Sequence, residues 1–143
     1  MNEMFCAEKG MGAYLNNSRI RVSKKRKIQD ALIVTGGPKG SSKIKDKIFS
    51  EYIKVSKNVS NVRKFGSAAL DIAYVACGRF DGYWQRELNY WDVAAGIIIL
   101  KEAGGFVDFF EEDNNNPLKK NILATNSHIH EDLRDLINKK DIE

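Results

Sequence analysis

A single carboxylate, Asp92, stands at the head of a segment built for close packing. The segment reads Trp91-Asp92-Val93-Ala94-Ala95-Gly96 and is followed by Glu102-Ala103-Gly104-Gly105. Apolar periodicity begins just after Asp92, which predicts a helix over residues 92–103 with Asp92 as its N-cap. Carboxylate oxygens are the ligands that Mg²⁺ prefers, and the positive end of a helix dipole tolerates an anion. An acid at the mouth of a buried helix can therefore hold a metal ion.

The predicted helix itself is expected to be buried nearly all round. Ala94, Ala95 and Gly96 carry almost no side chain, so the first turn can press against a sheet. Residues 97–100 read Ile-Ile-Ile-Leu, which makes the helix apolar on most sides. Gly104-Gly105 predicts its end, because glycine adopts the left-handed cap without a Cβ clash.

This segment resembles the second signature of the inositol monophosphatase family, whose members are Mg²⁺-dependent, lithium-sensitive phosphomonoesterases. Residues 66–83 are similar to that family's second-half helix and the strand after it, residues 8–16 to its central hairpin, and residues 122–126 to its last strand. The resemblance covers essentially all 143 residues. It implies an α/β fold, a mixed sheet with helices packed against it, as in the second half of the layered sugar-phosphatase fold.

The resemblance also implies roles for particular residues. Asp92 would bind a metal ion, Mg²⁺, and orient a substrate hydroxyl. The alcohol portion of a phosphorylated polyol would be held by Arg63, Gly66, Ser67, Ala68, Gln85 and Asp92. A helix N-terminus offers free N–H groups to an oxygen-rich ligand, which suits the stretch around Ser67. The alternative interpretation of these residues is structural: Ser67 only caps a core helix, and Arg63 is a surface residue that binds no ligand.

Gln85 departs from the family pattern. The family usually has Glu here and Gly two positions on, where this chain has Glu87. The family Glu accepts hydrogen bonds from inositol hydroxyls, whereas Gln is neutral and can also donate. Charged acceptors make bonds roughly twice as strong. A preference for inositol therefore stays open, and Glu87 is an alternative acceptor.

The family's first signature, Asp-Pro-(Ile/Leu)-Asp-Gly-Thr, supplies most of its metal ligands and does not occur here. The two prolines, Pro38 and Pro117, do not follow an aspartate. We therefore expect residues 1–143 to form a single carboxy-terminal α/β domain that is inactive by itself, because Mg²⁺ takes six oxygen ligands. Its expected partner is the missing amino-terminal half or a second copy of the chain. A shortened protein, a split gene and a degraded gene are three open origins.

The implied function is hydrolysis of a phosphomonoester such as myo-inositol 1-phosphate. Alternative substrates are fructose bisphosphate and a 3′-phosphoadenosine nucleotide. A different class of function is also open, in which the chain is a non-catalytic remnant or an interaction module that binds protein or RNA. The net charge of +4 comes largely from basic residues between positions 19 and 27. No aromatic side chains interleave there, so we expect a solvated loop and no nucleic-acid site.

The remaining patterns predict the frame around these residues. The longest apolar run, 93–100, is far shorter than the roughly 20 residues of a membrane helix. The two cysteines form no Cys-x-x-Cys pair, and free thiols suit the reducing cytoplasm. The stretch 36–42 fails the Walker spacing and predicts an ordinary strand-to-helix loop. His128 and His130 are expected at the surface. Strands are expected at 4–7, 12–15, 20–22, 31–35, 62–65, 80–84, 105–110 and 122–125, and helices at 42–56, 67–77, 92–103 and 128–138.

Overall fold

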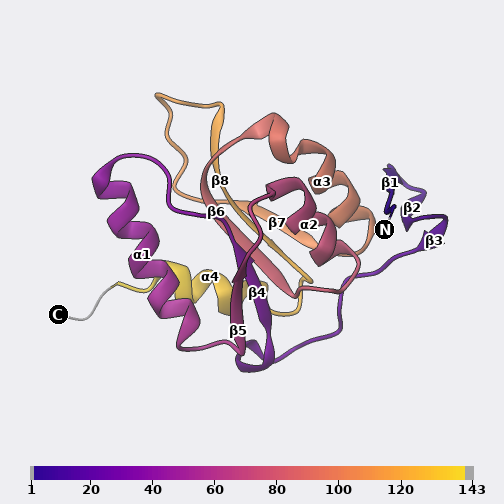
Figure 1. Ribbon diagram of the computed structural model, residues 1–143, viewed down its shortest axis with the longest axis horizontal. Helices are drawn as coiled ribbons and strands as arrows, with labels where there is room; N and C mark the ends of the chain where they lie inside the picture. Colours follow the sequence, from indigo (N-terminus) through magenta and orange to yellow (C-terminus); the bar gives the residue numbers. More distant parts are fainter. Residues whose placement is uncertain (1, 141–143) are drawn as a thin grey trace.

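The alternation of apolar side chains along the strands builds one central mixed sheet. A computed structural model describes residues 2–140 of the chain. The sheet order is β5 (Asn61–Lys64), β4 (Leu32–Thr35), β6 (Gly82–Asn89), β8 (Lys119–Thr125) and β7 (Phe106–Phe109). Strand β4 is parallel to β5 and β6, whereas β6 with β8 and β8 with β7 are antiparallel. The predicted mixed sheet is confirmed (Figure 1).

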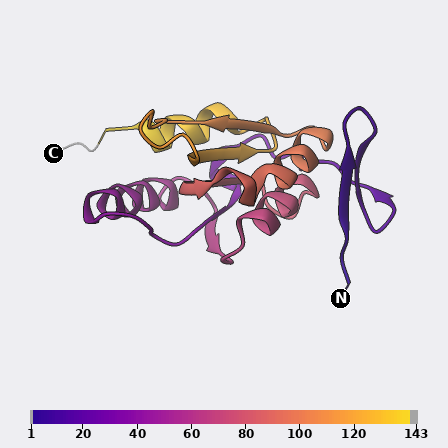
Figure 2. The ribbon, with the colours of Figure 1, turned by 90° about the horizontal axis from the view of Figure 1, so that it is seen from above.

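Helices cover both faces of this sheet. Tyr83 and Ile122 point to one face, where they pack with α2 (Ala68–Ala76) and α3 (Tyr90–Glu102). Their neighbours Trp84 and Leu123 point to the other face, toward α1 (Ser42–Ser56) and α4 (His130–Asn138). Viewed from above, α4 lies on one side of the strands and α2 and α3 lie on the other (Figure 2). The strand period of two therefore gives the sheet two separate apolar clusters.

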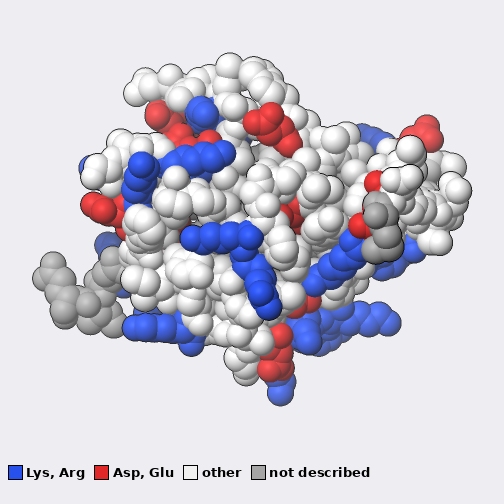
Figure 3. All heavy atoms as spheres, viewed as in Figure 1, with Lys and Arg blue, Asp and Glu red and all other residues white. Residues whose placement is uncertain are grey.

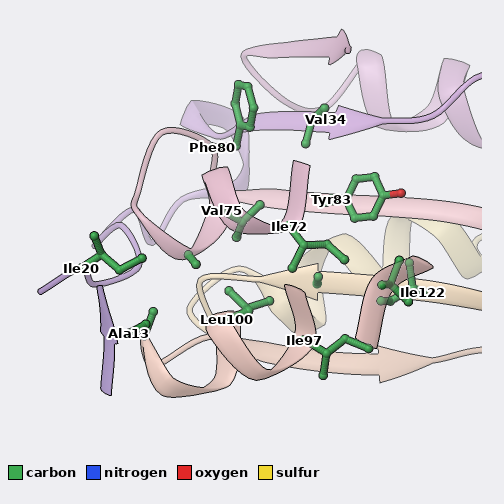
Figure 4. Packing of buried hydrophobic residues seen from close by; sticks show 14 of the residues in the cluster. Ala13, Ile20, Val34, Ile72, Val75, Phe80, Tyr83, Ile97, Leu100 and Ile122 are labelled. Carbon is green, nitrogen blue, oxygen red and sulfur yellow. The ribbon is translucent and has the colours of Figure 1, made fainter. Parts of the chain in front are cut away.

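The first cluster joins α2 and α3 tightly. Ile72 and Val75 of α2 and Ile97 and Leu100 of α3 lie together above the sheet (Figure 4). A Cβ at Gly96 would lie 3.2 Å from Cβ of Ile72, so the small residue allows α3 to approach α2. The prediction that this turn presses against the sheet is therefore wrong, because the glycine faces the neighbouring helix.

A small second sheet lies beside the end of α3. It consists of β1 (Phe5–Glu8), β2 (Gly12–Leu15) and β3 (Ser18–Arg19), all antiparallel. Glu102 at the end of α3 accepts hydrogen bonds from the backbone N–H groups of Gly10 (3.1 Å) and Gly12 (2.9 Å). The carboxylate thereby links the hairpin to the helix. Figure 1 shows the small sheet beside the end of α3.

Helix α1 spans the predicted residues, and Ser67 caps α2 as expected, accepting from the N–H of Leu70 at 3.4 Å. The predicted strand over residues 20–22 is wrong, since β3 ends at Arg19. Ile20 still donates to the carbonyl of Ala13 at 2.9 Å. His130 is buried rather than exposed, because its Nδ1 pairs with Thr125 Oγ1 at 2.8 Å.

Helix α3 differs from its prediction at the start and on one flank. Strand β6 runs directly into it, so that Asn89 is the N-cap and Asp92 lies in the first turn. Burial is also incomplete, since Trp91 is 64% and Ile98 is 49% exposed. Over the described residues, no helix combines the length and apolar character needed to cross a membrane.

Candidate functional site

A pocket lies where the parallel strands end. Thr35 near the end of β4 pairs with Lys64 of β5 and with Trp84 of β6, so the residues that follow them meet at one edge of the sheet. The pocket has a volume of about 360 Å³, within the range of small-molecule sites. Ligands of open α/β sheets bind outside the carboxyl ends of the strands. The topology therefore places a ligand-sized hollow where this rule expects one.

Five of the six predicted site residues line this single pocket. Its walls are Gly36, Gly37, Lys39, Gly66, Ser67, Ala68, Ala69, Gln85, Leu88 and Asp92. They come from the loops after β4 and β5, the start of α2, the end of β6 and the start of α3. Residues up to 56 positions apart in the sequence, from 36 to 92, therefore share one cavity.

The α2 end of the pocket presents backbone donors. Gly66 has a φ of 86°, a left-handed conformation that favours glycine, and a Cβ there would meet open space. Ser67 satisfies only the N–H of Leu70. The first N–H groups of a helix have no intrahelical acceptor, which makes this end of the pocket suited to anionic or hydroxyl oxygens.

The α3 end presents one carboxylate. Asp92 is exposed in the first turn, and Asn89 Nδ2 donates to its Oδ2 at 3.3 Å. The helix dipole favours an anion at this position. Across residues 2–140, no group of three or more His, Cys, Asp or Glu side chains could hold a metal ion. Asp92 thus fits as one ligand of Mg²⁺, and these residues do not complete the six-oxygen set by themselves.

Gln85 forms a fixed part of the wall. Its side chain is 7% exposed, and its Oε1 accepts a hydrogen bond from the Tyr83 hydroxyl. Gly36 lies directly against its carboxamide, because a Cβ at position 36 would be 2.1 Å from Cδ of Gln85. The Tyr83 hydroxyl and the backbone of Gly36 therefore restrict the Gln85 side chain on two sides in the absence of a ligand.

Glu87 does not reach the pocket. The register of β6 shifts between Gln85 and Leu88, and Glu87 occupies this irregularity with a φ of 63°. Its N–H donates to Asn121 Oδ1 at 3.0 Å. The left-handed backbone explains why glycine suits this position, and Leu88, not Glu87, lines the pocket.

A buried carboxyl on α2 interacts electrostatically with Tyr83. Asp71 of α2 is fully buried, and neither of its oxygens has a hydrogen-bond partner among the described residues. Burial raises the pKa of Asp71 to about 6. Burial, together with the charge of Asp71, also raises the pKa of Tyr83. Ionisation of Asp71 therefore affects Tyr83, the residue whose hydroxyl donates to Gln85.

Arg63 lies outside this group of residues. It is exposed on the edge strand β5, opposite Val34 of β4, and does not line the pocket. Sequence reasoning missed five lining residues: Ala69, Leu88 and, in the loop expected to be ordinary, Gly36, Gly37 and Lys39. The signal was available, since a glycine pair directly after a buried parallel strand permits close approach to a ligand.

Comparison with known proteins gives a consistent assignment. A profile of the Inositol monophosphatase family matches residues 1–141. The inositol-1-monophosphatase of Caulobacter vibrioides is 41% identical over 131 residues, which are 90% of this chain and 51% of that protein. Nus factor SuhB of Haemophilus influenzae is 40% identical, over 96% of this chain and 51% of its own length. The chain thus spans about half the length of these relatives.

Solved structures share this fold. The extragenic suppressor protein suhB of Bartonella henselae superposes with a TM-score of 0.87 at 45% identity, covering 97% of this chain and 53% of that one. Inositol monophosphatase from Anabaena gives a TM-score of 0.81 at 38% identity, covering 95% and 54% of the two chains. The profile match, the identities and the shared fold together show that this chain belongs to the inositol monophosphatase family.

Proposed function

We propose that this chain supplies the substrate-binding wall and one metal ligand of a Mg²⁺-dependent phosphomonoester hydrolase. The observation that carries the proposal is the meeting of Gly66, Ser67, Ala68, Gln85 and Asp92 in one pocket. Family membership supports the reaction class, and relatives bear the name inositol-1-monophosphatase. The substrate is a phosphorylated polyol or sugar, and the protein works in the cytoplasm.

Each side of the pocket has a distinct task in this proposal. The N–H groups at the start of α2 bind oxygens of the alcohol portion or of the phosphate. Lys39, exposed on the opposite loop, adds a positive charge beside them. Asp92 contributes one carboxylate to Mg²⁺, which when bound activates water and neutralises the leaving oxygen. The other carboxylate ligands come from outside these residues, in a second polypeptide or a longer protein.

The experiment joins this chain to the part of the Caulobacter relative that it does not match and measures hydrolysis of myo-inositol 1-phosphate with Mg²⁺. We expect turnover by the chimaera and none by the 143-residue chain alone. Asp92→Asn should lower turnover at least about 100-fold, since a carboxylate ligand is lost. Asp135→Asn, on the exposed side of α4, is the matched control.

Two results would contradict the proposal. An inactive, folded chimaera would show that this chain no longer supports the reaction. Equal activity of the Asp92→Asn and Asp135→Asn chimaeras would show that Asp92 does not bind the metal.

A second candidate function, RNA binding, is favoured by a separate basic hollow of about 690 Å³. Figure 3 shows Lys and Arg side chains gathered along the lower right of the molecule. The basic residues around the hollow are Lys24, Lys25, Arg26, Lys27 and Arg79. Several relatives bear the name Nus factor SuhB. The test is fluorescence anisotropy with a labelled single-stranded RNA: binding that weakens with salt and on Lys24→Gln/Lys25→Gln supports this candidate, and no binding at low salt rejects it.

A further inference from the structure

A groove runs along the outer side of α1. Its floor contains Phe49 and Ile53, which lie about one helical turn apart and are 51% and 54% exposed. The groove has a volume of about 580 Å³, which gives room for apolar side chains of another molecule. Two large apolar side chains are therefore exposed together in a concave part of the surface.

A lysine holds the second wall of this groove in place. Lys54 Nζ donates to the carbonyl of Ile137, at 3.4 Å, and to that of Lys139. These bonds tie the end of α4 and the residues after it to α1, which packs on α4 (Figure 1). The side chains of Lys139 and Lys140 line the groove from this wall. The position of the wall is therefore fixed by hydrogen bonds and by helix packing.

Positive charge is concentrated at one end of the groove. Four lysines line it, at positions 54, 57, 139 and 140, against one acidic residue, Asp46. Lys54 lies in the last turn of α1 and Lys57 is its C-cap, whereas Asp46 lies in the first half of the helix. Positions 46 and 57 are separated by about three helical turns. The groove therefore has an apolar floor, a basic end and an acidic end.

We propose that this groove binds an acidic amphipathic helix of a protein partner, with two apolar side chains on Phe49 and Ile53 and carboxylates beside Lys57, Lys139 and Lys140. An apolar helix face laid into a groove is a recurrent mode of peptide recognition, in which side chains one turn apart act as anchors. Complementary charges fix the orientation of such a helix. The contact is independent of the phosphatase proposal, since the groove and the pocket share no lining residue.

The composition of the groove favours a peptide over a nucleic acid. Single strands bind where successive bases stack on aromatic side chains. Among the described residues that line the groove, Phe49 is the single aromatic one, and Ile53 beside it offers apolar contact without stacking. The cations are lysines, which lack the planar fork with which arginine binds phosphate.

The test is fluorescence anisotropy with labelled peptides of about 16 residues, a length that permits a stable helix. One peptide carries two leucines four positions apart and glutamates in its first turn, and a second has lysines in place of the glutamates. The acidic peptide should bind the 143-residue chain, and added salt should weaken the binding. The lysine peptide should bind at least about tenfold more weakly, because like charges then meet at the basic end.

Two variants separate the apolar from the charged part of the contact. Ile53→Ser should weaken binding of the acidic peptide about tenfold, because apolar area is no longer buried. Lys139→Gln/Lys140→Gln should weaken it roughly threefold to tenfold and reduce its salt dependence. Both changes fall on exposed side chains, so thermal unfolding should stay close to that of the parent.

Each variant has a matched control outside the groove. Leu118→Ser removes an apolar side chain that is 52% exposed directly before β8. Lys43→Gln/Lys45→Gln removes two exposed charges from a part of α1 that does not line the groove. Both controls should bind the acidic peptide as the parent does.

Several results would overturn the proposal. These are no binding of the acidic peptide at low salt, equal affinity for the two peptides, and equal losses in the groove variants and their controls. A chain that sediments as a dimer and becomes a monomer on Ile53→Ser would assign the groove to a contact between copies. A single-stranded RNA that displaces the acidic peptide and loses affinity on Ile53→Ser would assign it to nucleic acid.

Discussion

The α-carbon of Gly36 rests on the carboxamide of Gln85. A Cβ at position 36 would lie 2.1 Å from Cδ and 2.2 Å from Oε1 of that side chain. The two residues follow Thr35 and Trp84, which are paired between the parallel strands β4 and β6. Glycine is required at position 36 by this close approach, and the arrangement fixes one wall of the pocket through its backbone.

Gly36→Ala should lower the free energy of unfolding by about 1–3 kcal/mol, the usual cost of overpacking a buried site. Gln85 cannot simply swing away, because the Tyr83 hydroxyl holds its amide. Urea unfolding measures the change. Gly37→Ala is the neighbouring control, since a Cβ there meets nothing within 4 Å; it should stay within about 0.5 kcal/mol of the parent.

The double variant Gly36→Ala/Gln85→Ala tests the cause. The shorter side chain at position 85 removes the overlap, so Gly36→Ala should cost much less in that background than in the parent. An equal cost in both backgrounds would show that the methyl group collides with something other than Gln85.

The sequence predicted most of the fold because its periodicities are clean. Helix α1 matched at both ends, since Ser41 and Ser42 follow a glycine and begin a regular apolar stripe. The start of α3 was misplaced because β6 continues into it without a turn, so no break in the pattern marks Asn89 as the cap. The burial of His130 was missed because it depends on packing against Phe106 of β7, whose ring centroid lies 4.5 Å from that of the imidazole and which is distant in the sequence.

The site was predicted only in part, because some of its residues belong to local motifs and others are brought together by strand pairing. Motif residues such as Ser67 and Asp92 could be named by resemblance, and both line the pocket. Gly36 and Tyr83 could not, because their roles depend on pairing between strands that lie almost 50 residues apart, as with Thr35 and Trp84. Local patterns do not encode which strands become neighbours in a parallel sheet.

A buried ion pair should anchor α1 to β6. Arg86 Nη2 donates to Glu51 Oε2 at 2.7 Å, and its Nε lies 3.0 Å from both Glu51 oxygens. The side chains are 6% and 2% exposed. Glu51→Gln should therefore lower the free energy of unfolding by about 3 kcal/mol, because it leaves a buried cation without its main partner.

Glu111 supplies the matched control for that change. It also accepts from Arg86, at 2.8 Å to Nη1, but its side chain is 44% exposed. Glu111→Gln should cost less than about 1 kcal/mol, as is typical of ion pairs at the surface. Equal losses for the two variants in urea unfolding would contradict an anchoring role for the buried pair.

Glu102 should hold the small hairpin sheet against α3. The hydrogen bonds from Gly12 and Gly10 lower the pKa of Glu102, so this stabilisation is present above the ordinary pKa of 4.5 and is lost as the pH falls through the lowered value. Glu102→Gln should speed hydrogen exchange at Ile20, whose N–H bonds Ala13 across the hairpin. Glu112→Gln is the control, and unchanged exchange in both would show that the hairpin is held by its apolar contacts alone.

Asp71 should make the protein less stable as the pH rises. Its pKa is raised from 3.8 to about 6 in the folded state by burial, without a hydrogen-bond partner among the described residues. A raised pKa means that folding favours the protonated form, so the penalty is absent below about pH 4 and grows until the pH passes about 6. The difference between the two pKa values corresponds to at most roughly 3 kcal/mol.

Asp71→Asn removes that titration and keeps nearly the same shape. The asparagine amide is also polar and buried, so the substitution changes the free energy of unfolding by an amount, of either sign, that does not depend on pH. The difference from the parent near pH 4 measures this offset. Relative to that offset, the variant should gain about 2–3 kcal/mol in the free energy of unfolding near pH 7.5. Asp135→Asn, an exposed change of the same kind, should give a difference from the parent that does not vary with pH. The measurement is urea unfolding at four pH values. A difference in the free energy of unfolding between Asp71→Asn and the parent that does not vary with pH would show that the buried carboxyl finds a compensating partner when it ionises.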